Sequence, residues 1–240
     1  MEFQRFELIL TWKNEFPHNL ENILKVLESG SSEEKIKILE TLEQTDNPVI
    51  LEKIISKLND ENIQVRGEAF SSLLLNKNNI VEILIKNLNS TSENIRGYTS
   101  LVLANRKETS SIPEIMKLVK DKRSIVRSCA LGALGYLKAQ EAEKIFVNSL
   151  SDSNMEVKKS ALQAIIELNI KISEEQINRI LKEKDHEIEK MISQSRKSGP
   201  EGIWTLDPMH AMHLSYQTRR PAPNYQNSDR NTFFKLVINV

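Results

Sequence analysis

Residues 112–137 read IPEIMKLVKDKRSIVRSCALGALGYL, and residues 143–168 read EKIFVNSLSDSNMEVKKSALQAIIEL. The two stretches share one pattern when Asp121 is aligned with Asp152. The same alignment pairs Val126 with Val157, Arg127 with Lys158, Ala130 with Ala161, and Leu134 with Ile165. A fixed period of this length indicates a solenoid, in which each repeat buries its apolar face against its neighbours.

The same pattern recurs toward the N-terminus at nearly constant intervals, with one copy for each basic residue of a series. The basic position of each copy is held by Lys35, Arg66, Arg96, Arg127 and Lys158. Six residues before each base stand Ser29, Asp60, Ser90, Asp121 and Asp152. Large aliphatic side chains stand eight residues before and seven residues after the base, which predicts a continuous apolar core along the repeats.

Each copy predicts two helices. In residues 49–78, Ile50, Ile54 and Leu58 recur at helical spacing, a polar turn follows at 59–62, and Val65 begins a second apolar stripe. Asp60 is suited either to cap the second helix or to pair with a basic side chain. The expected fold is all-α, a right-handed α-solenoid of about five two-helix repeats.

The expected array covers residues 20–197, with caps at both ends. Residues 1–19 predict an N-terminal capping helix. Leu181, Ile188 and Ile192 each lie one full period after a core position of the preceding copy, so a degraded sixth copy is expected there. Its basic position is Glu189, and its many charges are typical of a cap with a polar outer face.

This pattern resembles the HEAT-repeat superfamily, and in particular the short HEAT-like repeats of phycobilin lyases. The residues that carry the resemblance are the turn aspartates, the following valine or isoleucine with its base, and Ala69, Ala130 and Ala161. The resemblance covers about residues 20–195 and implies the fold. It does not imply one function, because the same array serves many tasks.

Residues 198–240 predict a low-order, disordered tail of different composition, rich in proline, histidine and arginine. The stretch GPEGIWTLDP at 199–208 resembles the peptide read from an antisense transfer-RNA gene. The open alternative is a true linear motif that docks on a partner or on the array itself. Under the first interpretation, deletion of the tail has no effect; under the second, it abolishes binding.

The overall charge balances at 33 basic and 33 acidic residues, which argues against a general nucleic-acid or membrane-surface binder. The charge is unevenly distributed. Residues 1–52 carry 11 acidic and 5 basic side chains, whereas residues 106–127 carry 7 basic and 3 acidic ones. The single cysteine, an N-terminus without a signal-peptide core and the absence of a long apolar stretch predict a cytoplasmic protein.

No catalytic residue, cofactor or metal site is predicted. Cys129 lies on an apolar helix stripe and indicates a core thiol. His186 precedes Glu187, and the deoxyhypusine-hydroxylase type of HEAT protein holds two irons with His-Glu pairs from several repeats. The other repeats of this chain hold no histidine at that position, and His210 with His213 supply too few ligands for a closed site.

The base and the Asp or Ser of each repeat predict a hydrogen-bonded ladder along the stack, in preference to a free binding stripe. Gly132 and Gly135 predict close helix packing. Positions between the core stripes of the second helices, together with two bases of the 117–127 segment, are the expected contacts to a partner. These candidates are Glu68, Ser71, Ser72, Tyr98, Lys122, Arg123, Ser128, Leu131, Gly135 and Lys159.

The favoured function is a protein–protein interaction scaffold or adaptor that holds an unidentified partner on the concave face, without catalysis. One alternative, implied by the resemblance, is a phycobilin-lyase-like enzyme or accessory that acts on a carrier protein. Another is nucleic-acid binding through the basic segment 117–127, as in some HEAT-like DNA-repair glycosylases. A loss of partner binding on charge reversal at Lys122 and Arg123 would favour the scaffold.

Overall fold

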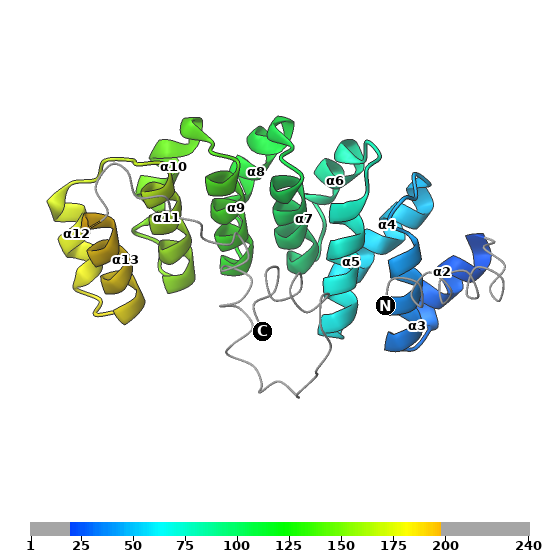
Figure 1. The fold of residues 1–240 in the computed structure, drawn as a ribbon. Helices are drawn as coiled ribbons and strands as arrows, with labels where there is room; N and C mark the ends of the chain where they lie inside the picture. Colours follow the sequence, from blue (N-terminus) through cyan, green and yellow to red (C-terminus); the bar gives the residue numbers. More distant parts are fainter. Residues whose placement is uncertain (1–19, 198–240) are drawn as a thin grey trace. The chain divides into compact units, whose positions relative to one another are not determined.

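The computed structural model describes residues 20–197, with side chains to residue 195. The expected capping helix at 1–19 and the tail at 198–240, with His210 and His213, lie outside the described residues. Within that range the chain is all-α, without a strand (Figure 1). Its α-helices are α2 (Leu20–Ser29), α3 (Ser32–Thr41), α4 (Pro48–Ser56), α5 (Ile63–Leu75), α6 (Val81–Asn87), α7 (Glu93–Asn105), α8 (Ile112–Leu118), α9 (Ser124–Tyr136), α10 (Glu143–Ser149), α11 (Met155–Glu167), α12 (Glu174–Leu181) and α13 (His186–Lys197). These helices confirm the α-solenoid class.

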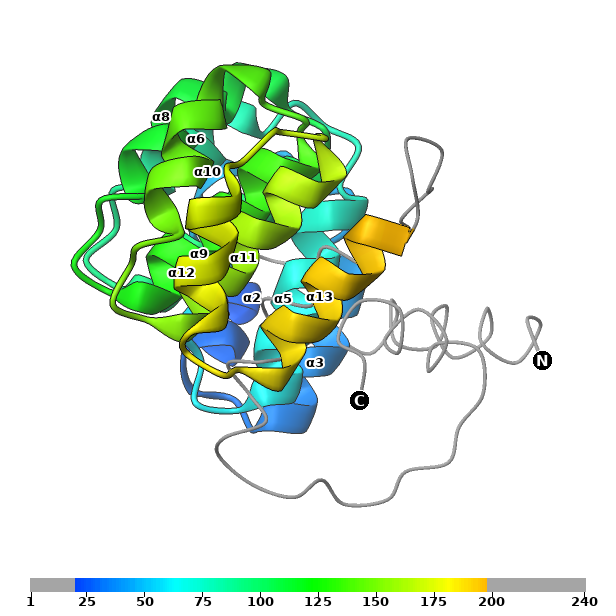
Figure 2. The ribbon, with the colours of Figure 1, turned by 90° about the vertical axis from the view of Figure 1, so that its left-hand side faces the viewer.

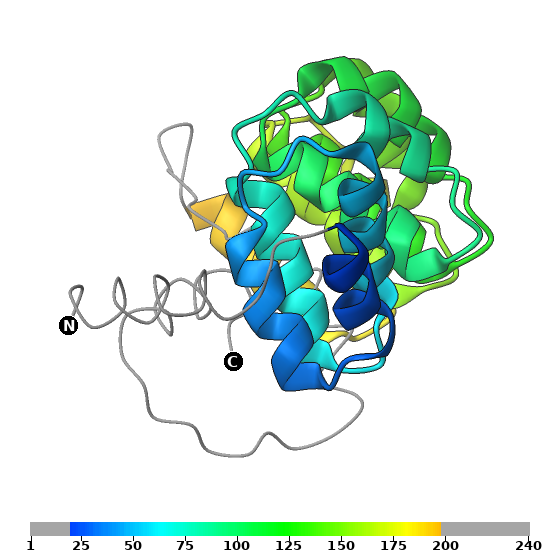
Figure 3. The same ribbon diagram turned by 90° about the vertical axis from the view of Figure 1, so that its right-hand side faces the viewer.

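The chain divides into two compact units at the bond between Ile95 and Arg96, inside α7. In the first unit, α2 packs against α4 and α4 packs against α6, so the first helices of successive repeats form one layer. The second helices α3 and α5 pack against each other as the other layer. Figure 3 shows this unit in blue to cyan.

The second unit repeats the two-layer arrangement. Its second helices α9 and α11 pack along each other, and α11 also contacts α13. The shorter helices α8 and α10 each pack on the second helix of their own repeat. Figure 2 shows α9 and α11 in one layer, with α8 and α10 in the other. The residues of the expected sixth copy form a helix pair, α12 and α13, which contact each other.

The recurring apolar positions form the core, as the period predicts. Leu27 of α2, and Leu58 and Leu88 just after α4 and α6, have at most 1% of their surface exposed. On the second helices, Ala69, Ala130 and Ala161 are completely buried. A small side chain at this position lets neighbouring helices approach closely, which explains why three of the repeats hold alanine there.

Polar residues set the helix boundaries. Asn62 and Asn154 are the N-caps of α5 and α11, and each accepts hydrogen bonds from two backbone N–H groups of the first turn. Ser31 and Ser173 are the N-caps of α3 and α12 and form complete capping boxes. These bonds satisfy N–H groups that the helix itself leaves without a partner.

The second helices of the second unit end in one recurring turn. Lys107, Lys138 and Asn169 follow α7, α9 and α11 at equivalent positions of the repeat, and all three have positive φ angles between 52° and 60°. In the turn after α9, Lys138 N–H bonds to Gly135 O at 2.9 Å and Ala139 N–H bonds to Leu134 O at 3.0 Å. This pair of bonds is the Schellman motif, in which glycine usually holds the left-handed position.

Candidate interaction surface

In four of the repeats, the basic side chain in the first turns of the second helix binds a carboxylate of the next repeat. Lys35 Nζ lies 3.0 Å from Asp60 Oδ2, and Arg96 Nε lies 2.7 Å from Asp121 Oδ2. Arg127 Nη2 lies 2.8 Å from Asp152 Oδ1, and Lys158 binds Glu183. We call these four pairs the rungs of the ladder. The predicted inter-repeat ladder is confirmed, so these bases do not form a free binding stripe.

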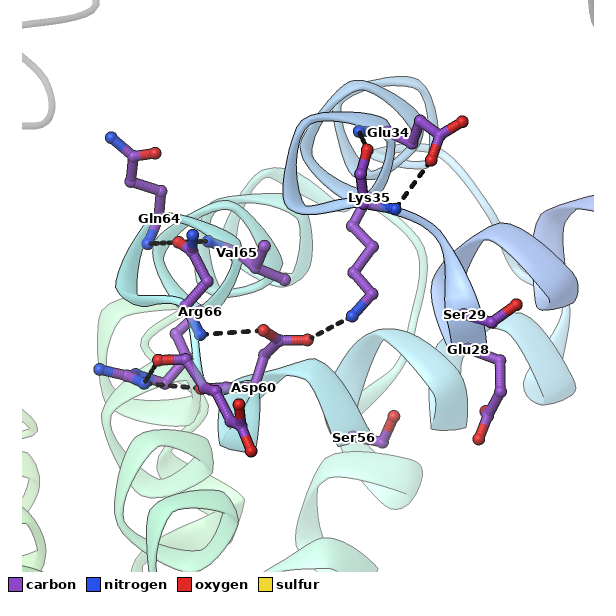
Figure 4. A network of polar contacts seen from close by, with 12 residues as sticks. Glu28, Ser29, Glu34, Lys35, Ser56, Asp60, Gln64, Val65 and Arg66 are labelled. Atoms are coloured by element: carbon purple, nitrogen blue, oxygen red, sulfur yellow. Dashed lines mark hydrogen bonds and ion pairs between the residues drawn. The ribbon is translucent and has the colours of Figure 1, made fainter.

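Asp60 shows how one residue joins two repeats (Figure 4). One carboxylate oxygen accepts from Lys35, and the other accepts from the backbone N–H of Asn62 at 3.0 Å. Asn62, not Asp60, caps α5, because its side chain accepts from Gln64 N–H at 2.8 Å. Of the two roles expected for Asp60, pairing is therefore the one that the structure contains.

The arginine rungs are charge-assisted and use two nitrogens. Arg127 binds Asp152 through both Nε and Nη2, and its Nη1 donates to the carbonyl oxygen of Asp121 at 2.9 Å. Burial alone would raise the pKa of the Asp152 carboxyl, but the hydrogen bond from Arg127, the hydrogen bond from the Asn154 backbone and the nearby positive charges together lower that pKa. The pKa of Asp121 is lowered in the same way, by Arg96, the Arg123 backbone N–H and Lys122 together. Both carboxylates are therefore held ionised.

The repeat that begins with α6 lacks a carboxylate for this ladder. Ser90 stands where three of the repeats have Asp60, Asp121 and Asp152, and its hydroxyl accepts from Ser92 N–H at 3.3 Å. Arg66, the base that precedes it, donates to the carbonyl oxygens of Asp60 at 2.6 Å and Glu61 at 3.1 Å. No ion pair can form between Arg66 and Ser90, because serine carries no charge.

Most of the expected partner contacts are buried within the array. Seven of the ten candidates are buried: Glu68, Ser71, Ser72, Tyr98, Ser128, Leu131 and Gly135. On α9 the neighbouring helix explains the burial. Ser128 Oγ lies 2.9 Å from Ser160 Oγ of α11, and a Cβ on Gly135 would lie 2.9 Å from Ala164 Cβ. The expected partner contacts at Ser128 and Gly135 are therefore wrong, because α11 fills the space beside them.

The remaining three candidates are charged. Lys122 and Arg123 are exposed in the turn between α8 and α9. Lys159 of α11 is half-buried, and its Nζ lies 2.6 Å from Glu187 Oε2 and 3.3 Å from Asp185 Oδ2. Burial lowers the pKa of Lys159, but Glu187, Glu156 and Asp185 together outweigh this effect, so the net shift of the pKa is upward. Lys159 therefore joins the last two repeats, and Lys122 and Arg123 remain the accessible candidates.

The structure shows the surroundings of Cys129, Gly135 and His186, which the sequence analysis considered for catalysis, helix packing or metal binding. Cys129 is 1% exposed, and desolvation raises its pKa to about 12, which keeps the thiol protonated at neutral pH. This confirms the predicted core thiol. The close packing expected at Gly135 is likewise confirmed. His186 is exposed at the start of α13, and among residues 20–197 no group of three or more histidine, cysteine or acidic side chains could hold a metal ion.

The first unit has two open hollows on its layer of first helices. One, of about 520 Å³, lies between α2 and α4, and the other, of about 650 Å³, lies between α4 and α6. Val49 and Glu52 line both hollows. Ion pairs from Lys53 to Glu28 and from Lys86 to Glu52 link the helices on either side. These charged side chains are used between repeats, and do not converge on one point as in a small-molecule site.

The repeat pattern did not predict several hydrogen bonds between neighbouring repeats. Asn76 and Asn78, after α5, donate to the carbonyl oxygens of Thr45 at 2.7 Å and Gln44 at 2.9 Å in the preceding repeat. The sequence indicates only that asparagine stands in the turn after a second helix. Because asparagine is common in turns for several reasons, its presence does not predict a bond to the preceding repeat. The rung at Glu183 could have been found, because Glu183 lies one full period after Asp152.

Stacked helix pairs joined by a periodic ladder define a class, the helical-repeat proteins or α-solenoids. Within this class, residues 81–166 match the family of HEAT repeats. The crystal structure of an engineered protein from the Northeast Structural Genomics Consortium is similar, with a TM-score of 0.45 and 19% identity over 73% of this chain and 94% of that one. A designed armadillo repeat protein has a TM-score of 0.39 and 18% identity over 74% of this chain and 98% of its own. No curated protein matches the sequence.

Among the described helices, none is long and apolar enough to cross a membrane.

Proposed function

We propose that the chain is a protein-binding scaffold that carries no catalytic activity of its own. HEAT-type arrays generally mediate protein interactions, and residues 81–166 match that family. The proposal applies this general role to the present chain, so the proposed partner is a protein. The phycobilin-lyase-like and nucleic-acid-binding alternatives remain predictions from the sequence.

The proposal rests on one observation: side chains at recurring positions and side chains at non-recurring positions have different roles. The residues at the recurring positions of the repeat, such as Arg127, Asp152 and Ala161, are used for the ladder and the core. The exposed residues that differ from one repeat to the next, such as Lys122 and its counterpart Ser153, have no such structural task. Non-recurring surface residues on a regular array are those that can specify a partner.

The test is affinity capture from native lysate with the full chain and with residues 1–197 as parallel baits, followed by mass spectrometry. The expected result is a stoichiometric protein that both baits retain, and that binds the purified chain in a calorimetric titration. A partner that only the full chain retains would make residues 198–240 part of the binding element and would overturn the antisense interpretation. If neither bait retains a protein beyond an unrelated repeat protein used as control, the scaffold proposal fails.

A further inference from the structure

The turns between first and second helices in the second unit use all their acidic side chains internally. Asp121 binds Arg96, Asp152 binds Arg127, and Glu183 binds Lys158 as rungs of the ladder. The fourth acid, Asp185, lies 3.3 Å from Lys159. Each of these carboxylates is already paired with a base from the preceding repeat. The acids of the turns are therefore largely neutralised by the ladder and compensate little of the neighbouring positive charge.

The same turns carry cations that take no part in the ladder. We call these exposed residues the basic edge: Lys120, Lys122 and Arg123 before α9, and Lys182 and Lys184 before α13. The four lysines form no ion pair with any residue in the range 20–197. The turn between these two clusters exposes Ser151 and Ser153, which are neutral. The edge thus has two positive clusters with a hydroxyl-bearing gap between them.

Hydrogen bonds and ion pairs place the three turns in one row. Arg127 bonds to the Asp121 carbonyl of the first turn and to the Asp152 carboxylate of the second. Lys158, which follows the second turn, binds Glu183 of the third. Neighbouring helices pack about 8–10 Å apart, so the two positive clusters are separated by roughly 20 Å. An extended peptide covers this distance with about six residues, at about 3.3 Å per residue.

The positive charge is a property of these turns and not of the repeat pattern. The corresponding turns of the first unit, residues 28–31, 59–62 and 89–92, read ESGS, NDEN and NSTS and contain no lysine or arginine. The recurring aspartate is kept in two of the three turns of the second unit, with Glu183 in the third, while the flanking residues change. Stability of the ladder therefore does not explain the cations.

We propose that the basic edge binds an extended acidic segment of a partner protein, with acidic residues opposite each cluster and neutral residues across Ser151 and Ser153. This inference rests on the proposed scaffold function and names its partner chemistry. A nucleic-acid strand fits less well. Its phosphates recur at every nucleotide and would also lie across Ser151 and Ser153, where the turn offers no cation, whereas a peptide can place its carboxylates at the two clusters alone.

The test uses the full chain and a fluorescein-labelled decapeptide, Asp-Glu-Asp-Ser-Ser-Ser-Ser-Asp-Glu-Asp, in an anisotropy titration at about 50 mM salt. The variant K120E/K122E/K182E should weaken binding by at least about tenfold, because three attractive contacts become repulsive. The matched control, K107E/K144E/K171E, makes the same charge change at exposed lysines of the second unit outside the edge. It should change the affinity by less than about twofold, since screening limits distant charges.

Circular dichroism and the thermal midpoint verify that both triple variants are folded. Equal weakening by the two variants would overturn the proposal, because attraction would then come from net charge alone. Tighter binding of a mixed 12-nucleotide single strand than of the peptide would also overturn it, in favour of phosphate recognition. A partner captured from lysate that K120E/K122E/K182E retains fully would overturn the basic edge but leave the scaffold function standing, whereas the absence of any captured partner would overturn the scaffold function itself.

Discussion

At the residue scale, the ladder depends on one carboxylate in each repeat, and the pair of Arg66 and Ser90 shows what its absence means. Asp60, Asp121 and Asp152 each accept from the backbone N–H two residues later and from a base of the preceding repeat. Ser90 makes the first bond but has no charge for the second. The local turn is therefore kept in this repeat, and the electrostatic contribution of the rung is lost.

Replacement of Ser90 by aspartate should restore the rung within the first unit. We expect S90D to raise the free energy of unfolding by about 0.5–1 kcal/mol, because a partly buried arginine–carboxylate pair stabilises by that order. Urea denaturation checks the value. The variant S90N is the control, since it keeps the turn-forming acceptor without the charge. If S90N gives the same gain as S90D, the effect belongs to the turn and not to an ion pair with Arg66.

Small residues on the second helices show why the fold could be predicted better than the contact surface. The repeat period locates the core and the rungs, because each copy repeats the same positions. Whether Ser128 or Gly135 faces a groove or a neighbouring helix depends on how closely α9 and α11 pack. The sequence pattern contains no measure of that distance. Small side chains are compatible with both arrangements, so the expected contact site was wrong there.

At the scale of the element, Gly135 determines how closely α11 packs on α9. A Cβ at this position would lie 2.9 Å from Ala164 Cβ and 3.3 Å from Ala164 Cα, so backbone must move to admit it. We expect G135A to lower the free energy of unfolding by about 1–3 kcal/mol, as is typical of an overpacked core. Thermal and urea midpoints measure this loss.

The matched experiment for this helix pair is the double variant G135A/A164G, which moves the methyl group from one helix to the other. It should recover part of the loss, although glycine in a helix costs up to about 1 kcal/mol. If the free energy of unfolding lost in G135A/A164G equals the sum of the losses in G135A and in A164G, the strain is not located between Gly135 and Ala164.

The turn that ends α9 offers a stabilising change. Lys138 has a φ of 54°, in the left-handed region where a side chain costs about 1–2 kcal/mol. Glycine removes this strain but loses more entropy on folding, so K138G should raise the free energy of unfolding by about 1 kcal/mol. The comparison variant K138A removes the charge and keeps the strain. Similar stability of K138G and K138A in chemical denaturation would contradict the conformational explanation.

At the scale of the whole molecule, the rungs make stability depend on pH. The pKa values of the carboxyls of Asp60, Asp121 and Asp152 are lowered in the folded chain, since hydrogen bonds and nearby bases outweigh the opposing effect of burial. A carboxyl with a lowered folded pKa stabilises the fold above its unfolded pKa, which is about 3.9 for aspartate. That contribution is lost as the pH falls through the folded value.

We therefore expect the urea midpoint to be nearly constant from about pH 7 to pH 5 and to fall below about pH 4. In D152N, one rung no longer titrates, so the midpoint should be lower at neutral pH and fall less steeply in acid. R127Q removes the base of the same rung and completes a double-mutant cycle. A coupling energy between Arg127 and Asp152 that does not shrink from pH 6 to pH 2.5 would contradict this account.

The ladder also has a direction, and direction governs how such a chain can change its length. The base of each rung reaches forward to an acid in the following copy, and Asp121 and Asp152 each lie six residues before the next base in the sequence. An in-frame duplication of one full period between Asp121 and Lys158 therefore supplies one new base together with one new acid, wherever the cut falls. Growth by internal duplication keeps every pair matched, whereas a copy placed after α13 would meet Glu189 where a base is needed. Internal duplication is therefore the change in length that preserves the ladder.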